Sequence, residues 1–312
     1  MQTLTDTVAA QPAPEQFLGS ISNEKVRRSL AALTQPHAYR WDTLFPKVDG
    51  LGAAGEVHRR VRMLRSIEPR LDVLLYPGEQ VEFVTKGTLN SWAEQYFMGI
   101  WSLVINRTVF LFTNYRVILL NSDGKGRAKS LMWQIPYDRL GKFKTSGVSG
   151  TTTFKLASGA AYRFVGVPRA DRKRLREYVA SRLDSARSSD VAFPSHSDRD
   201  PLCPLCATPT PPKARACAEC NEPFVHPRVP ALLSLLVPGL GDLYLGHRTM
   251  AVMEFIGFAF LLLVAAGMML SGTSQDILTA CIIVAVANGV DAAMTYHVAR
   301  KGVLSRRLAW RG

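Results

Sequence analysis

Two long apolar stretches in the last third of the chain decide its architecture. Residues 249–271 read TMAVMEFIGFAFLLLVAAGMMLS, and residues 277–299 read ILTACIIVAVANGVDAAMTYHVA. About 20 apolar helical residues cross a bilayer, because each adds about 1.5 Å along a hydrocarbon core about 30 Å thick. The short link between the stretches forces an antiparallel helical hairpin. We therefore predict two membrane spans, with a hairpin buried in a soluble core as the alternative.

A third apolar run, residues 229–245, precedes the hairpin and is interrupted by PGLG at 238–241. The link 272–276 has no Lys or Arg, whereas the tail 300–312 contains Arg300, Lys301, Arg306, Arg307 and Arg311 and no acid. Cytoplasmic flanks are enriched in basic residues. We therefore predict a re-entrant or interfacial segment at 229–246. We place the protein in the cell inner (plasma) membrane, multi-pass, with both termini cytoplasmic.

Composition bounds the remaining part of the chain. Its 312 residues can hold two or three domains, and the net charge of +13 arises mostly before residue 229, since six of the 38 basic residues lie beyond it. A basic cytoplasmic surface attracts anionic lipid, and it can also attract nucleic acid. Residues 1–14 are polar and do not resemble a signal peptide, so we expect the first span to direct insertion.

The sequence predicts a multi-domain α+β membrane protein. Residues 71–184 alternate short runs rich in β-branched and aromatic residues with turns, and they end in an amphipathic helix at 169–183. We expect antiparallel strands at 80–86, 97–106, 108–112, 116–121, 130–136, 151–156 and 161–165, curled into a barrel that the helix plugs. The other expected parts are a disordered lead with basic helices at 1–70, a linker at 185–201, a cysteine-rich module at 202–226, the membrane block at 229–299 and a basic tail at 300–312.

Three motifs in this strand-rich region suggest a family. PGE at 77–79, LFTNYRVIL at 111–119 and IPY at 135–137, followed by the closing helix, resemble the bacterial pleckstrin-homology-like (PH-like) domains, close to the GRAM type. The resemblance covers residues 71–183. It implies a binding module without catalytic residues, of which some bind phosphoinositides.

Basic residues near the expected turns of this region are candidates for contact with lipid headgroups. The alternative is ordinary solvated loop charge, and a sheet edge that accepts a peptide strand is a further possibility. The candidates are Lys125, Arg127, Lys129, Lys142 and Lys144.

Two CxxC pairs, Cys203 with Cys206 and Cys217 with Cys220, carry the strongest chemical signal. Two such turns supply four thiolates at the corners of a tetrahedron, which suits a structural Zn²⁺ and leaves no position open for water. The segment resembles the short zinc ribbons, although Ala207 and Asn221 stand where that family often has glycine. A redox CxxC is the alternative.

Polar residues inside the membrane block form a second candidate site. Glu254 and Asp291 fall at similar depth in the two spans, and intramembrane carboxylates are costly enough to mark function. The alternative is a structural cluster in which these acids bond Arg248 or the backbone freed at Pro238. The full candidate set is Asp242, Glu254, Asp291, Asn288 and Arg248.

Residues 238–246, PGLGDLYLG, resemble the signature of small two-helix membrane domains of the TM-two type. Cys281, Ala285, Gly289 and Ala293 form a small-residue stripe, which permits close helix packing within the hairpin or in a homodimer.

These observations lead to one main hypothesis and two alternatives. No stretch resembles a catalytic triad, a P-loop or a dinucleotide fingerprint, so we expect no enzyme and no catalytic residues. The hypothesis is an integral membrane adaptor that holds a PH-like domain and a zinc ribbon at the cytoplasmic face, where they bind an unknown protein or anionic lipid. The alternatives are a small transport or proton-coupled unit using Glu254 and Asp291, and a membrane-tethered nucleic-acid binder, although we do not expect nucleic acid as a partner.

Overall fold

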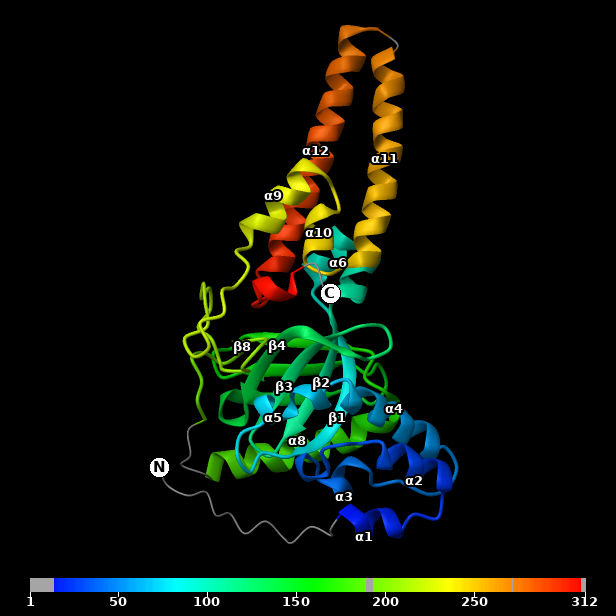
Figure 1. Ribbon diagram of the computed structural model, residues 1–312, viewed down its shortest axis with the longest axis vertical. Coiled ribbons are helices and arrows are strands. Elements are labelled where there is room, and N and C mark those ends of the chain that lie inside the picture. Colours follow the sequence, from blue (N-terminus) through cyan, green and yellow to red (C-terminus); the bar gives the residue numbers. More distant parts are fainter. Residues whose placement is uncertain (1–13, 189–192, 271, 310–312) are drawn as a thin grey trace. The chain divides into compact units, whose positions relative to one another are not determined.

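A computed structural model of the chain describes residues 14–188, 193–270 and 272–309. It combines one antiparallel sheet of eight strands with two long apolar helices, drawn in orange in Figure 1. The chain divides into two compact units. The first comprises residues 1–89, 107–128 and 135–193, and the second comprises 90–106, 129–134 and 194–312.

The strands follow the order β5-β6-β7-β1-β2-β3-β4-β8, which leaves β5 and β8 as edges. The described strands thus form an open sheet, and the strand order does not show the closed barrel expected from the sequence. The strands are β1 (Val81–Leu89), β2 (Arg107–Thr113), β3 (Arg116–Ser122), β4 (Ala128–Pro136), β5 (Leu140–Thr145), β6 (Thr152–Leu156), β7 (Ala161–Val165) and β8 (Asp200–Leu202).

The centre of the sheet is an apolar hairpin. β2 and β3 pair with Phe112 opposite Val117, and nearly every residue of both strands is buried. Strands covered on both faces read as continuous apolar runs, which is why this hairpin was visible in the sequence. Aromatic rings from neighbouring strands extend the core: Phe110 lies 4.8 Å from Phe164 and 5.8 Å from Phe154, centroid to centroid.

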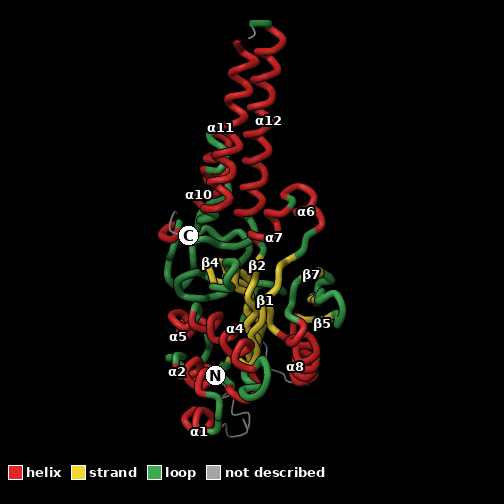
Figure 2. Tube along the Cα trace, turned by 90° about the vertical axis from the view of Figure 1, so that its right-hand side faces the viewer, coloured by secondary structure: helices red, strands yellow, loops and turns green. Residues whose placement is uncertain are grey.

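Helices cover the sheet in the first unit. α8 packs against β5 and buries Leu175 and Val179, and Figure 2 shows the two elements side by side. α4 contacts β1 and α2. The helices of this unit are α1 (Pro14–Gly19), α2 (Glu24–Ala31), α3 (Trp41–Leu44), α4 (Ala53–Arg65), α5 (Leu71–Leu74) and α8 (Arg169–Ser188), with 3-10 turns at Pro36–Ala38, Glu68–Arg70 and Tyr137–Arg139.

The second unit is mostly helical. Its two longest helices, α11 and α12, are long and apolar enough to cross a membrane, and α9 packs against α12. The helices are α6 (Trp92–Met98), α7 (Ile100–Ile105), α9 (Arg228–Leu236), α10 (Leu240–Tyr244), α11 (Arg248–Leu270) and α12 (Ser274–Ala299), with a 3-10 turn at Arg306–Leu308.

Several local predictions were wrong. Residues 97–106 were expected as a strand but form the end of α6 and all of α7, which meet at Gly99. Two strands were not expected, namely β5 and, at the end of the expected linker, β8. Residues 14–19 of the expected disordered lead are helical, whereas residues 1–13, Ser271 and Arg311 lie outside the described residues.

Candidate functional site

Four cysteines converge in the second unit. The sulfur atoms of Cys203, Cys206, Cys217 and Cys220 all lie within 4.8 Å of one another. The Sγ atoms of Cys203 and Cys220 are 3.7 Å apart, and those of Cys206 and Cys217 are 3.4 Å apart. A tetrahedral site with metal–sulfur bonds of about 2.3 Å separates its sulfur atoms by about 3.8 Å. The cluster can therefore hold a metal ion.

The two CxxC turns share one backbone geometry. In each, the N–H of the first cysteine donates to the carbonyl five residues later, and the residue after the second cysteine donates back to the first. That residue is Ala207 in one turn and Asn221 in the other, with φ of 53° and 56°. Asparagine visits this left-handed region readily, but alanine does so at a cost. Both turns adopt this left-handed conformation, and each turn directs its two thiols to a common centre.

The environment of Cys206 favours a thiolate, the form that binds metal. Burial raises the pKa of this thiol, but hydrogen bonds with the hydroxyl and backbone of Thr208, and with Cys217 and Cys220, outweigh burial and bring the pKa to about 7. The Thr208 hydroxyl lies 3.2 Å from Cys206 Sγ.

The chain that follows α12 returns to the cysteine module. Phe224 and Ser305 form an antiparallel bridge, and Val225 N–H donates to Leu304 O at 2.8 Å. The Ser305 hydroxyl donates to the buried Glu222 carboxylate. Val303 packs into the apolar cluster of Cys203, Cys217 and Phe224. The segments just before α9 and just after α12 are thus bonded to each other.

Three carboxylates meet inside the helical block. Ligand atoms of Asp242, Glu254 and Asp291 lie within 4.8 Å of one another. Asp291 Oδ2 accepts the N–H of Gly239 at 3.1 Å, and Asp242 Oδ1 lies 2.9 Å from His247 Nδ1. Glu254 Oε2 is buried and has no hydrogen-bond partner among the residues that the structure describes. The structure therefore brings together the three acidic candidates from the sequence, which lie on α10, α11 and α12.

Other candidates of this set lie around the cluster. Asn288 Nδ2 donates to Leu235 O at 3.0 Å, and the Thr295 hydroxyl bonds both Ser234, at 2.9 Å, and Asp242, at 3.3 Å. These bonds hold α9 and α10 against α12. Arg248 is exposed at the start of α11, and no ion pair among the described residues joins it to the three acids.

Two glycines let these helices approach closely. Gly239 has a φ of +87°, and a Cβ there would lie 2.8 Å from Ala251 O. A Cβ on Gly241 would lie 2.2 Å from Pro230 O and 2.5 Å from Ser234 Oγ. At the PGLG segment the backbone thus lies directly against neighbouring helices, and a residue larger than glycine would not fit at either position.

A polar network joins the helix pair α6–α7 to the C-terminal end of α12. Glu94 accepts hydrogen bonds from Lys301 at 2.7 Å and from Asn106, and it lies 3.1 Å from His297 Nε2. Burial raises the pKa of Glu94, but its partners, Lys301 first among them, outweigh burial and hold the pKa below its usual value. Met98 packs in the same apolar cluster as residues of α11 and α12.

The motif residues of the first unit form a lock between two turns. The Thr113 hydroxyl donates to Glu79 Oε1 at 2.7 Å, and Arg116 donates to both oxygens of Glu79 at 2.9 Å. Asn114 completes the lock, because its side chain accepts the N–H of Gln80 and donates to Gly78 O. The PGE and TNYR motifs are therefore used to hold the fold.

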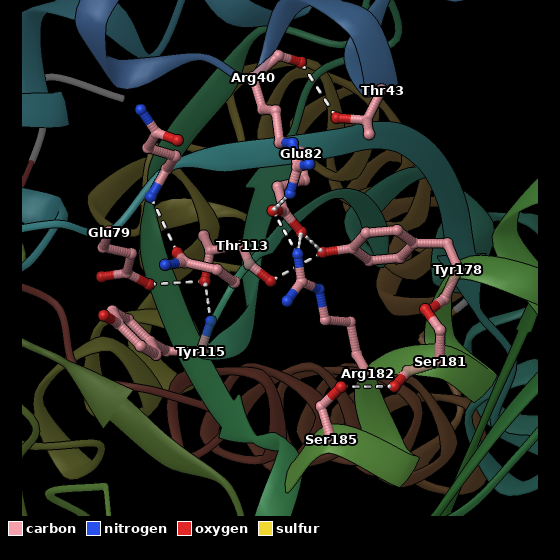
Figure 3. A network of polar contacts seen from close by, with 12 residues as sticks. Arg40, Thr43, Glu79, Glu82, Thr113, Tyr115, Tyr178, Ser181, Arg182 and Ser185 are labelled. Atoms are coloured by element: carbon pink, nitrogen blue, oxygen red, sulfur yellow. Dashed lines mark hydrogen bonds and ion pairs between the residues drawn. The ribbon is translucent and has the colours of Figure 1, made fainter. Parts of the chain in front are cut away.

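A second buried carboxylate lies nearby, on β1. Figure 3 shows Tyr178 and Arg182 of α8 and Arg40 of the N-terminal region directed at Glu82, and all three contact its carboxylate. The Tyr178 hydroxyl also lies 2.8 Å from Thr113 O. Burial raises the pKa of Tyr178 well above its usual value, so its phenol stays protonated and donates.

The structure does not gather the five headgroup candidates. Lys125 and Arg127 lie in the turn after β3, where Arg127 Nε pairs with Asp123 at 2.7 Å. Lys129 lies on β4, and Lys142 and Lys144 lie on the edge strand β5. Three further basic residues that sequence reasoning missed lie nearby, namely Lys155 on β6, Arg163 on β7 and Arg176 on α8. Their proximity depends on the strand order β5-β6-β7, which the local pattern does not reveal.

The small-residue stripe of α12 faces outward. Cys281, Ala285, Gly289 and Ala293 are exposed, and a Cβ on Gly289 would meet no atom within 4 Å. In the described residues the stripe therefore does not serve the contact between α11 and α12.

Comparisons with known proteins assign no family. No family model matches the chain, and no curated protein matches it. Among solved structures, the crystal structure of the C-terminal domain of an unknown protein from Leishmania infantum aligns at 10% identity with a TM-score of 0.27. That alignment covers 38% of this chain and 92% of the other. A likeness at this level assigns neither a fold nor a function.

Proposed function

We propose that this protein is an integral membrane adaptor that holds a PH-like binding domain and a structural zinc ribbon at the cytoplasmic face. The observation that carries the proposal is the exposure of α11 and α12. Only 6% and 11% of their most apolar windows are buried, and large side chains such as Phe260 and Leu263 are 68% and 72% exposed. A core helix of a soluble protein buries one face, whereas helices that are apolar all round and uncovered suit lipid.

The bridge between tail and cysteine module supports an even number of spans. Phe224 precedes the helical block and Ser305 follows it, yet they pair directly. If the block spans a bilayer, this pairing needs both flanks on the same side, which favours two spans over three. The basic flank and the uncharged link favour the cytoplasm for that side.

Zinc is the proposed metal. Four thiols at tetrahedral separations, with no other residue type among them, suit Zn²⁺ and leave no place for substrate. The metal would join two short turns that bury little apolar surface of their own, so its role is structural. Metal analysis of the purified chain should find one zinc per molecule.

The PH-like assignment of the first unit rests on the motif lock and on the antiparallel sheet packed by α8. The motifs hold turns together, so recognition of a partner would fall to other surfaces of the domain. The proposed role is binding of protein or lipid, without catalysis.

Cysteine accessibility tests the topology. In a Cys281→Ser background, Gln275→Cys places one thiol in the link and Val148→Cys places one in an exposed loop of the first unit. A membrane-impermeant maleimide should label Gln275→Cys in intact cells, and Val148→Cys only after permeabilisation. Labelling of both before permeabilisation, or release of the wild-type chain by carbonate without detergent, would contradict the proposal.

A transport or proton-coupled unit is the second candidate. The observation in its favour is the convergence of Asp242, Glu254 and Asp291, with Glu254 Oε2 lacking a partner. If the block transports ions or protons, Glu254→Gln and Asp291→Asn should abolish flux in proteoliposomes while the protein still folds. Absence of flux in the wild type would remove this candidate.

A further inference from the structure

A basic cleft lies at the edge of the sheet in the first unit. It has a volume of about 400 Å³ and lies between β5, β6, β7 and α8. Its charged lining consists of Lys144, Arg163 and Arg176, and no acid from the described part of the chain lines it. A volume of this size suits one small ligand or headgroup.

The strand register gathers the charges on one face. Lys144 is opposite Thr153, and Thr153 is opposite Arg163 on the next strand. Directly paired residues of neighbouring strands share a face. Lys142 lies directly opposite Lys155 on the same face, beside the cleft. Like charges in this arrangement destabilise a sheet.

These charges are not compensated within the protein. The cleft residues Lys144, Arg163 and Arg176 are exposed, and no ion pair among the described residues includes them. Several arginines elsewhere in the first unit meet acids, as Arg127 meets Asp123 and Arg116 meets Glu79. An uncompensated basic face that carries a repulsive pair indicates an anion supplied from outside.

The polar groups of the cleft are arranged as donors. Ser146 Oγ accepts the N–H of Ser149, and the Ser149 hydroxyl donates to Thr151 Oγ1. The hydroxyl protons of Ser146 and Thr151 can then point to a ligand. Ammonium, guanidinium and hydroxyl donors together match the oxygens of a phosphate.

We propose that this cleft binds the phosphate-bearing headgroup of an anionic membrane lipid. The inference rests on the proposed function, because a membrane hairpin in the same chain keeps the first unit close to a bilayer. It differs from the candidate set read from the sequence, since the cleft includes Lys144 but neither Lys125, Arg127 nor Lys129. Nucleic acid is less suited, because single strands are bound by long basic grooves that take several nucleotides, whereas this cleft has a volume of about 400 Å³.

The test compares two variants that lose the same charge. Lys144→Gln with Arg163→Gln removes two cleft residues, and Lys47→Gln with Lys173→Gln removes two exposed lysines elsewhere in the first unit. Each full-length protein, held in phosphatidylcholine nanodiscs, is titrated with phosphatidylcholine vesicles with and without phosphatidylglycerol. Wild type and control should prefer phosphatidylglycerol and bind within about twofold of each other. The cleft variant should bind about 30-fold more weakly, since each basic residue near an anionic surface contributes about fivefold.

Further titrations use inorganic pyrophosphate and a DNA duplex. Equal vesicle binding by all three proteins would overturn the proposal. So would binding of pyrophosphate in the cleft without vesicle binding, which would indicate a soluble phosphate ligand, or a cleft-dependent affinity for DNA that exceeds the affinity for vesicles. Carbonate extraction of the same proteins keeps the two proposals apart. Retention in the membrane with no lipid preference contradicts the cleft alone, whereas extraction of the wild type contradicts the adaptor.

Discussion

Two pairs of buried carboxylates, one in each unit, have different partners. In the first unit, Glu79 and Glu82 are almost fully buried and each is met by arginine. In the helical block of the second unit, Asp242 and Asp291 are also buried, but their partners are a histidine, hydroxyls and a backbone N–H, with a third carboxylate close by. A buried carboxylate paired with arginine must stay charged, whereas one that accepts from a hydroxyl or a backbone N–H keeps its bond when it is replaced by an amide. This contrast predicts which substitutions each pair tolerates.

The largest effect is expected at the proposed zinc site. If the four cysteines hold zinc, its removal by a chelator, or Cys203→Ser, leaves thiols without their common partner, and structural zinc contributes about 10 kcal/mol or more to such modules. The module should unfold and release its bridge to Ser305. Limited proteolysis of nanodisc-held protein should then cut near residue 305. Cys281→Ser is the matched control and should leave the cleavage pattern unchanged.

The next effect concerns the arginine pairs. Glu79→Gln removes the negative charge that neutralises the fully buried Arg116. It should lower the free energy of unfolding by about 3–5 kcal/mol. Pulse proteolysis of the full-length chain measures it. Arg127→Gln breaks an exposed pair and should cost less than about 1 kcal/mol. Equal losses of unfolding free energy for the two variants would contradict the expectation that a buried ion pair is costlier to break than an exposed one.

Asp291→Asn should cost far less than Glu79→Gln. The amide oxygen can still accept the N–H of Gly239, so we expect a loss of about 1 kcal/mol or less. Asp291→Leu removes the acceptor and should cost about 1–3 kcal/mol. The same proteolysis in nanodiscs compares them. If Asp291→Asn is as costly as Glu79→Gln, the contrast between the two pairs of carboxylates is wrong.

The smallest effect is a pH dependence at Glu94. Its pKa is lowered in the folded protein, so its contribution to stability is complete above the unfolded value of about 4.3 and is lost as pH falls through the lower folded pKa. Thermal midpoints below about pH 4.3 should fall more steeply for wild type than for Glu94→Gln. Parallel curves would show that the bond to Lys301 contributes little.

The features that could be predicted from sequence are those set by local pattern. The central hairpin was placed within one residue at each end, and the four cysteines were paired by spacing alone. Residues 97–106 were missed because a short apolar run is compatible with a strand or a buried helix, and only Gly99, with its positive φ, separates α6 from α7. The edge strand Leu140–Thr145 was missed because it is rich in lysine and glycine.

Sites formed by distant segments were predicted only in part. The depth of Glu254 and Asp291 along their helices brought them into one set, and the structure adds the bonds that tie them to α9 and α10. The basic cleft was not predicted, because it depends on which strands become neighbours. Lys144 is near Arg163 only because β6 lies between β5 and β7.

The bridge between Phe224 and Ser305 also bears on biogenesis. The partners are separated by the whole hairpin. If α11 and α12 span a bilayer as proposed, a chain in which only one of them had inserted would hold Phe224 and Ser305 on opposite sides of the membrane, and the bridge could not form. Protection of the cysteine module from proteases would then distinguish complete from half-complete insertion.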